Sequence, residues 1–287
     1  MGIETQWPLV LFTLFSGIGA GLLIPTGIAE LADKSNEKTR SVALIVSLIM
    51  LIAGGCFSLL HLAAPHNVMS AVYNIFSFSG ISMELILLGA CCIVTLVFLV
   101  AVKRALGSNV LKAISIIGII VAVLLMYFCG HGYVMPSRPA WDTEMLPIAY
   151  LGTSLAGGIF AYGVILALYK GDEGDVKIYR NVVLLGTIVC ACSCAMYCIA
   201  VIADAVDESA IAFWCGLVIC GIVLMLVVGV FAFLKLEPGN LMTVAIFGLV
   251  VAVIAILAVR VVMWDTSEGY LELFPLAATG SPYVSIL

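Results

Sequence analysis

Eight apolar stretches, each close to the length of a membrane-spanning helix, determine what this chain can fold into. A helix needs about 20 apolar residues to cross a bilayer. The hydrocarbon interior admits only helices or closed barrels, and barrel strands are short segments of alternating polarity. We therefore predict an all-α polytopic membrane protein, a bundle of eight transmembrane helices. The predicted spans are Trp7–Leu31, Ser41–His61, Ile81–Val102, Ala113–Gly130, Pro147–Tyr169, Asn181–Ala203, Ile211–Leu234 and Leu241–Trp264.

The composition excludes two broad classes of protein. Apolar residues make up 64% of the chain and charged residues only 10%, whereas a soluble domain carries about 25% charged residues. A soluble globular enzyme is therefore excluded. The net charge of −5 and the lack of a basic stripe argue against nucleic acid as a partner, which leaves membrane lipids as the surroundings. Because no linker interrupts the pattern, we expect residues 1–287 to form a single domain.

Basic residues in the connecting loops predict the orientation. Ten of the 12 Lys and Arg residues fall in loops on one side of the predicted bundle. Such loops face the cytoplasm, so an even number of helices places both termini on the outer side. The outer side also has the longer segments, and a partner is expected to dock there. The ten residues are Lys34, Lys38, Arg40, Lys103, Arg104, Lys112, Lys170, Lys177, Arg180 and Lys235.

Neither the cysteines nor the histidines predict a metal or haem site in this chain. All ten cysteines lie inside apolar runs, where cysteine is mostly a small packing residue, and no Cys-x-x-Cys pair occurs. A bis-histidine haem needs facing histidine pairs. Only His61 and His131 lie at predicted helix ends, both on the outer side.

Three polar residues of the predicted spans stand out because the topology places them at one depth on the outer side. Arg260 lies about one turn inside the last helix, as either a functional charge or a cation that snorkels to the headgroups. His61 closes the second helix, as either a cap or a proton acceptor. Glu84 lies in the first turn of the third, as either a partner of the helix dipole or a proton relay. Together they could form a site for a lipid-soluble quinol, which loses protons when it is oxidised.

Other polar residues near the outer side are interpreted as solvated loop positions. They are His66, Asn74, His131, Arg138, Asp142 and Glu144. Loop 131–146 is rich in proline, glycine and aromatic residues, so we expect it to have a fixed shape.

Small residues suggest close helix packing and an internal repeat. Gly17-x-x-x-Gly21 has the spacing of a close helix–helix contact. Residues 13–17 (TLFSG) resemble residues 153–157 (TSLAG) in the fifth span. Because both spans run in the same direction, a parallel duplication of four helices plus four is possible.

Taken together, these residues resemble the membrane-anchor subunit family of the dimethyl sulfoxide reductase type of molybdenum oxidoreductase. The resemblance extends over the whole chain in length and helix layout, whereas its specific parts are local. They are Trp7-Pro8-Leu9 with Phe12-Thr13, Leu60-His61-Leu62-x-x-Pro65, Asn74, Ser82-x-Glu84, and Arg260 with Trp264.

The resemblance implies a menaquinol site near the outer face of the bacterial cytoplasmic (inner) membrane. It implies that electrons pass to an iron–sulfur subunit and then to a molybdopterin catalytic subunit, both on the outer face, so that this chain oxidises quinol but carries no redox metal. The family's quinol-site histidine falls on His61, its acidic partner on Glu84, and an arginine of its last helix on Arg260. Ala63 stands where the family has glycine, which alters the turn beside the site.

Two other functions are compatible with eight helices. A secondary transporter would show polar residues and broken helices near the midplane. Here the midplane positions are mostly aliphatic, and Pro25 is the main interruption. A structural anchor without a quinol site would tolerate replacement of His61, Glu84 and Arg260.

Overall fold

The computed structural model describes residues 5–33, 36–60, 79–138, 140–169 and 171–266, without the side chains of residues 203–208. All regular structure in these residues is helical, and they contain eight helical spans long and apolar enough to cross a membrane. The predicted helical fold is confirmed. The elements are α1 (Trp7–Leu31), α2 (Glu37–Leu60), α4 (Gly80–Lys103), α5 (Ser108–His131), α6 (Met145–Leu168), α7 (Glu173–Glu208), η3 (Ala212–Leu224) continued by α8 (Met225–Lys235), and α9 (Leu241–Asp265).

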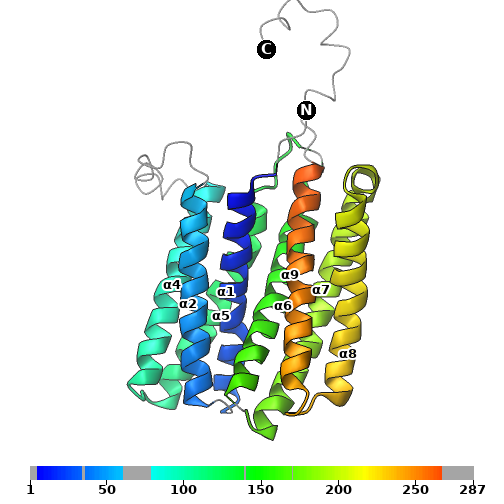
Figure 1. Ribbon diagram of the computed structural model, residues 1–287. Coiled ribbons are helices and arrows are strands. Elements are labelled where there is room, and N and C mark those ends of the chain that lie inside the picture. Colours follow the sequence, from blue (N-terminus) through cyan, green and yellow to red (C-terminus); the bar gives the residue numbers. More distant parts are fainter. Residues whose placement is uncertain (1–4, 34–35, 61–78, 139, 170, 267–287) are drawn as a thin grey trace, which may run out of the picture.

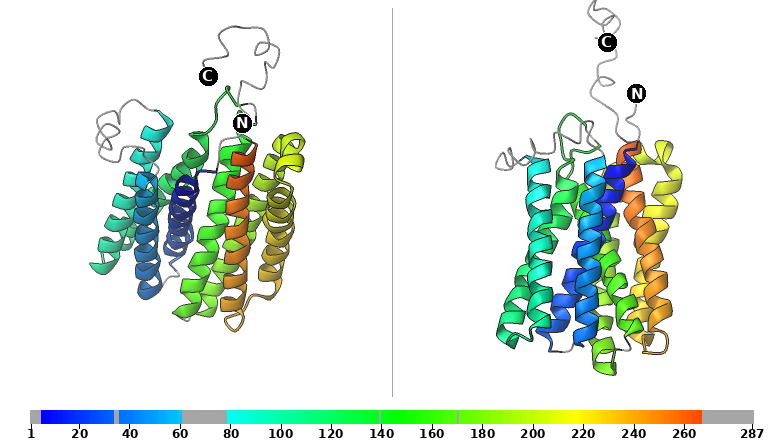
Figure 2. Two further views of the ribbon diagram at one scale, coloured as in Figure 1. Left: turned by 45° about the horizontal axis from the view of Figure 1, so that its top comes forward. Right: turned by 60° about the vertical axis from the view of Figure 1, so that its left-hand side comes forward.

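The helices run alternately up and down and form one elongated bundle (Figure 1). We call the end where α1 begins and α9 ends the upper end, and the opposite end the lower end. α1 and α6 lie in the middle, with α2, α4 and α5 on one side and α7, η3, α8 and α9 on the other (Figures 1 and 2). The upper end therefore gathers the start of α1, α4 and α6 with the end of α5 and α9.

The central pair, α1 and α6, packs through glycines. An added Cβ on Gly21 would lie 2.6 Å from the backbone oxygen of Ser154, and one on Gly158 would collide with the backbone of Gly21. One turn higher, a Cβ on Gly17 would meet the Ser154 side chain. The predicted close contact through Gly17 and Gly21 is confirmed, since small residues let helix backbones approach each other. α1 and α6 are the two most buried spans.

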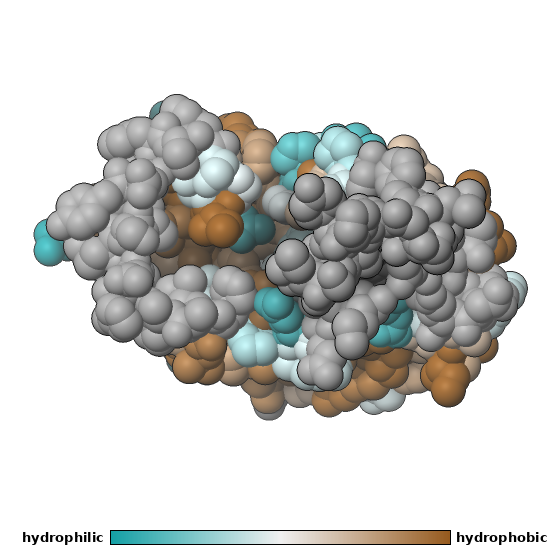
Figure 3. Space-filling view, turned by 90° about the horizontal axis from the view of Figure 1, so that it is seen from above, coloured by the Kyte–Doolittle hydropathy of each residue, from teal (hydrophilic) through white to brown (hydrophobic). Residues whose placement is uncertain are grey.

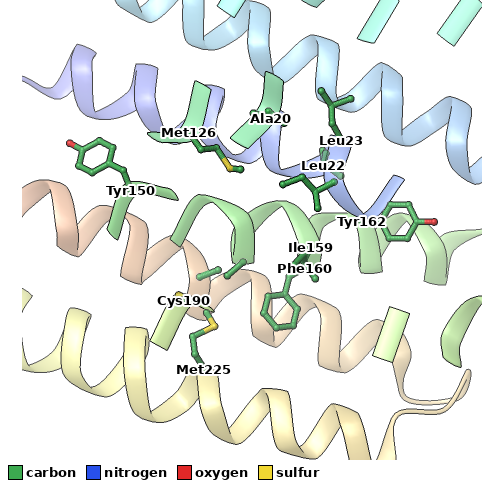
Figure 4. Close-up of a cluster of buried hydrophobic side chains, with 14 of the residues drawn as sticks. Ala20, Leu22, Leu23, Met126, Tyr150, Ile159, Phe160, Tyr162, Cys190 and Met225 are labelled. Atoms are coloured by element: carbon green, nitrogen blue, oxygen red, sulfur yellow. The ribbon is translucent and has the colours of Figure 1, made fainter. Parts of the chain in front are cut away.

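Large apolar side chains fill the space around this contact. Figure 4 shows Leu22 of α1, Ile159 and Phe160 of α6, and Met126 of α5 in one buried cluster. The described cysteines include members of the same core: Cys91, Cys129, Cys190 and Cys194 are fully buried and free. This agrees with the prediction that cysteines act here as packing residues.

Several helices extend past the predicted spans. α2 begins at Glu37 rather than Ser41, and α7 begins at Glu173 rather than Asn181. Hydropathy detects the part of a helix that prefers lipid, whereas the helix itself continues into polar residues. Glu173 and Asp175 lie in the first turn of α7, where acidic side chains favour a helix start. The upper half of the seventh span, η3, is wound as a π-helix.

Ion pairs tie the helices together at the lower end. Arg40 of α2 pairs with the buried carboxylate of Glu30 on α1. The Nζ atom of Lys112 on α5 lies 2.7 Å from the Oδ2 atom of Asp33, in the turn after α1. A cavity of about 300 Å³ lies beside these groups and is lined by Glu30, Asp33, Arg40, Leu106, Ser108 and Leu111. This polar cavity is at the end of the bundle opposite the predicted site.

Candidate functional site

Two of the three predicted site residues lie in the described part of the chain. Glu84 is in the first turns of α4 and Arg260 is in the last turns of α9, so both lie near the upper end. His61 lies outside the described residues, as do His66 and Asn74. The predicted depth of Glu84 and Arg260 therefore agrees with the fold.

Arg260 is completely buried between α9, α1 and α6. Its Nε–H donates a hydrogen bond to the Thr13 hydroxyl at 2.7 Å, and one terminal nitrogen donates to the Thr13 carbonyl oxygen at 3.3 Å. The other terminal nitrogen donates to the carbonyl oxygen of Ile256, one turn lower on α9, at 2.9 Å. The side chain thus points into the bundle and down, so the snorkelling interpretation is wrong.

An aromatic ring completes the surroundings of Arg260. The guanidinium carbon lies 4.1 Å from the ring centre of Tyr150 on α6, a cation–π geometry that is strongest away from water. No carboxylate of the described residues lies within ion-pair distance of this cation. Its charge is therefore stabilised by hydroxyl, carbonyl and ring groups.

Glu84 lies where the start of α4 meets the end of α5. A Cβ on Gly132 would lie 2.9 Å from the Glu84 Oε1 atom, and a Cβ on Gly80 would lie 3.0 Å from the Gly132 Cα atom. Ser79 caps this end of α4 and accepts a hydrogen bond from the Ser82 amide at 3.4 Å. Two glycines thus bring the helices together and leave room for the carboxylate. No group of the described residues donates a hydrogen bond to the two oxygens with which this carboxylate can accept one.

Four aromatic side chains connect the region of Glu84 with that of Arg260. Tyr133 follows directly after Gly132, and its ring centre lies 5.8 Å from Trp141, 6.2 Å from Tyr150 and 6.0 Å from Trp264. The indole N–H of Trp141 donates to the Met263 carbonyl oxygen at 2.6 Å. This cluster, Tyr133, Trp141, Tyr150 and Trp264, fixes the 132–144 loop against α6 and α9, as the composition of that loop predicted.

Both charged groups act on the phenol of Tyr133. Burial raises the pKa of Tyr133 well above its ordinary value, Tyr150 and Glu84 raise it further, and Arg260 acts in the opposite direction. Tyr133 is therefore a neutral hydroxyl under physiological conditions, within electrostatic reach of a carboxylate on one side and a guanidinium on the other. Reasoning from the sequence missed Tyr133 and Tyr150. The aromatic content of loop 131–146 was a signal for Tyr133, whereas Tyr150 lies inside α6 and had no such signal.

Figure 3 looks onto the upper end of the bundle, where the described residues include hydrophilic ones beside hydrophobic ones. At mid-depth the surroundings differ: a cavity of about 410 Å³ is lined only by apolar side chains of α1, α2, α6 and α9, among them Leu14, Ile18, Met50 and Val253. Polar chemistry near the upper end thus borders an apolar interior.

A second cluster of polar side chains at the upper end faces outward. The Tyr127 hydroxyl donates to Glu144 at 2.6 Å, and the His131 Nδ1 atom lies 3.6 Å from the same carboxylate. The side chains of His131 and Glu144 are 40% and 54% exposed. Asp142 is exposed too, whereas Arg138 is partly buried, with its guanidinium carbon 4.8 Å from the Trp141 ring centre. The solvated-loop interpretation is confirmed for Asp142 and Glu144. It is incomplete for Arg138 and for His131, which ends α5 and whose Nδ1 atom is buried.

Among the described residues, no group of three or more His, Cys, Asp or Glu side chains could hold a metal ion. The arrangement at the upper end offers hydrogen-bond acceptors, a neutral donor and a buried cation beside apolar walls. These groups can bind an amphipathic molecule with polar oxygens and can accept its protons.

Comparison with known proteins identifies the family of this chain. The family described as DMSO reductase anchor subunit (DmsC) matches residues 1–265 of the chain. The anaerobic dimethyl sulfoxide reductase chain YnfH of Escherichia coli (strain K12) is 26% identical over 190 residues. That match covers 65% of this chain and 66% of YnfH, just under two thirds of its length.

Proposed function

Because this chain belongs to the family of DMSO reductase anchor subunits, we propose that it anchors a molybdenum-containing respiratory reductase in the bacterial cytoplasmic membrane and oxidises menaquinol there. The anchor function follows from the family. The quinol site is supported by one observation above all: the Glu84 carboxylate lies beside Gly132 at the upper end of the bundle, and no described residue donates a hydrogen bond to it.

In this proposal the upper end faces the outside of the cell. Of the ten Lys and Arg residues that predict the orientation, the eight that the structure describes all lie at the lower end, mostly at helix ends, and segments that carry such residues remain in the cytoplasm. Both termini then lie outside. An iron–sulfur subunit docks on the upper face and passes electrons to a molybdopterin catalytic subunit. This chain contributes neither cluster nor molybdenum.

Oxidation of one quinol to the quinone releases two protons and two electrons. His61 accepts a hydroxyl proton, and the Glu84 carboxylate passes protons toward the outer water. Arg260 contributes positive charge, which favours the quinol oxygen as it loses its proton. Because Arg260 is held by Thr13 and Tyr150, it acts from inside the bundle. Both electrons leave to the iron–sulfur subunit. Protons and electrons leave on the same side, so this step does not itself build a membrane potential.

Replacement of Glu84 by glutamine in the assembled complex tests the proposal. The amide keeps the shape of the side chain but accepts no proton, so we expect quinol-driven reduction of the terminal acceptor to fall about 100-fold, the lower range for general base catalysis. Reduction driven by an artificial dye that feeds the partner subunits directly should not change. Glu144→Gln is the matched control, because Glu144 is an exposed carboxylate at the same end.

Two outcomes would contradict the proposal. Full quinol-driven activity in Glu84→Gln would favour a structural anchor without a quinol site. A chain that purifies from active cells alone, without molybdenum or iron in stoichiometric partners, would favour a transporter. The apolar lining of the mid-depth cavity already argues against a transport path there, since transporters bind substrate near the midplane.

A further inference from the structure

The proposed function gives no role to the hydroxyl of Tyr133, which lies at the upper end of the bundle. Its ring is held on three sides by Trp141, Tyr150 and Trp264, so the position of the side chain is fixed by packing. No hydrogen bond joins its hydroxyl to another described residue, and Tyr133 is half-buried, so its hydroxyl is not one of the buried polar atoms that lack a partner. A tyrosine with an apolar ring in a packed cluster and a polar tip outside it can donate that hydroxyl to a ligand.

The position of Tyr133 relates it to Glu84. Tyr133 follows Gly132, the residue against which the Glu84 Oε1 atom rests. Glu84 and Arg260 both act on the phenol electrostatically, in opposite directions. A molecule that places an oxygen beside Glu84 therefore also lies close to the Tyr133 hydroxyl. The phenol retains its proton and can donate, whereas an ionised carboxylate can only accept.

We infer that the Tyr133 hydroxyl donates a hydrogen bond to an oxygen of the quinol head and that Tyr133 and Glu84 hold the head between them. This inference rests on the proposed function and adds to it a binding residue from the loop between α5 and α6. The donor favours the quinol oxygen that becomes negative as its proton leaves. The surrounding aromatic rings supply an apolar wall for the quinol ring.

Tyr133→Phe tests the inference, because it removes the hydroxyl and preserves the ring that packs against Trp141, Tyr150 and Trp264. In the purified complex we expect about a tenfold increase in KM for a naphthoquinol with a truncated side chain, typical of one lost hydrogen bond. The Kd of a hydroxyquinoline N-oxide, a quinol analogue, should rise by a similar factor. Dye-driven activity should remain at the wild-type level. Tyr127→Phe is the matched control, since Tyr127 bonds to the exposed Glu144 instead.

The outcomes separate this inference from the proposed function. If Glu84→Gln impairs quinol oxidation while Tyr133→Phe has wild-type KM and Kd, the inference is overturned and the quinol site stands. If neither variant changes quinol oxidation, both fall. If Tyr133→Phe lowers dye-driven and quinol-driven activity equally, the hydroxyl serves assembly and the inference is also overturned.

Discussion

The guanidinium of Arg260 donates a 2.7 Å hydrogen bond to the hydroxyl of Thr13, a residue 247 positions away in the sequence. This contact joins the last helix of the bundle to the first, and the ring of Tyr150 on α6 lies against the same guanidinium. A buried cation without a carboxylate partner among the described residues depends on these neutral groups. These contacts also explain why the Arg260 guanidinium stays at membrane depth and does not reach the lipid headgroups.

Replacement of Arg260 by methionine should destabilise the bundle. The change removes hydrogen bonds from a charged group and the cation–π contact, and we expect a loss of about 2–3 kcal/mol in the free energy of unfolding. Thr13→Val removes only the hydroxyl and should cost about 1 kcal/mol. Unfolding in mixed micelles measures both.

The double variant Arg260→Met, Thr13→Val shows whether the two side chains act on each other. The effects of replacing two residues that share a hydrogen bond are not additive. The double variant should therefore lose less free energy of unfolding than the two single variants lose in sum. Additive losses would mean that the contact contributes nothing to stability.

Gly158→Ala should separate α1 from α6. Its Cβ would collide with the backbone of Gly21, which no rotamer change can relieve. We expect a cost of about 1–3 kcal/mol, typical of an overpacked core, together with a reduced yield of folded protein. Gly89→Ala is the control, because a Cβ there meets nothing within 4 Å. Equal thermal stability of the two variants would contradict the close contact.

Gly132→Ala should impair quinol oxidation without preventing assembly. The new Cβ would approach the end of the Glu84 side chain, so the carboxylate must move. The φ of Gly132 is −59°, which alanine adopts without strain. We expect about a tenfold lower quinol-driven rate, since small displacements of reacting groups are costly, with dye-driven activity intact. The control is Gly118→Ala in α5, the helix that Gly132 caps, where the nearest atom to an added Cβ lies at 3.5 Å. A wild-type rate in Gly132→Ala would mean that the position of Glu84 is unimportant.

The pH dependence of Tyr133 is also predictable. Burial raises the pKa of Tyr133 well above the ordinary value, which is about 10 for tyrosine. A raised pKa means that the stabilising protonated form is fully present below about pH 10 and is lost only as the pH rises through the higher folded value. The difference in quinol-analogue affinity between wild type and Tyr133→Phe should therefore be constant from about pH 6 to pH 9. An alkaline difference titration between the two proteins, followed by tyrosinate absorbance, measures the ionisation directly. A difference in affinity that disappears below pH 9 would refute the prediction.

The number of helices and their order along the chain follow from the sequence alone. A bilayer requires each spanning segment to satisfy its own backbone hydrogen bonds, so eight apolar stretches can form little else than eight helices. The contact at Gly17 and Gly21 was predictable too, because small residues at this spacing allow close approach. Helix ends such as Glu173 were not, since hydropathy reports affinity for lipid and a helix can continue beyond it.

The partners of the polar side chains were decided by the tertiary structure. Depth in the membrane follows from position in a span, and it placed Glu84 and Arg260 correctly at one end. The direction of each side chain depends on how its helix is rotated and which helix packs beside it. That arrangement directs Arg260 to Thr13 and Tyr150, rests Glu84 against Gly132, and places Tyr133 where both charges act on it. Hydropathy carries no such information, because it gives the same value to every rotation of a helix about its axis.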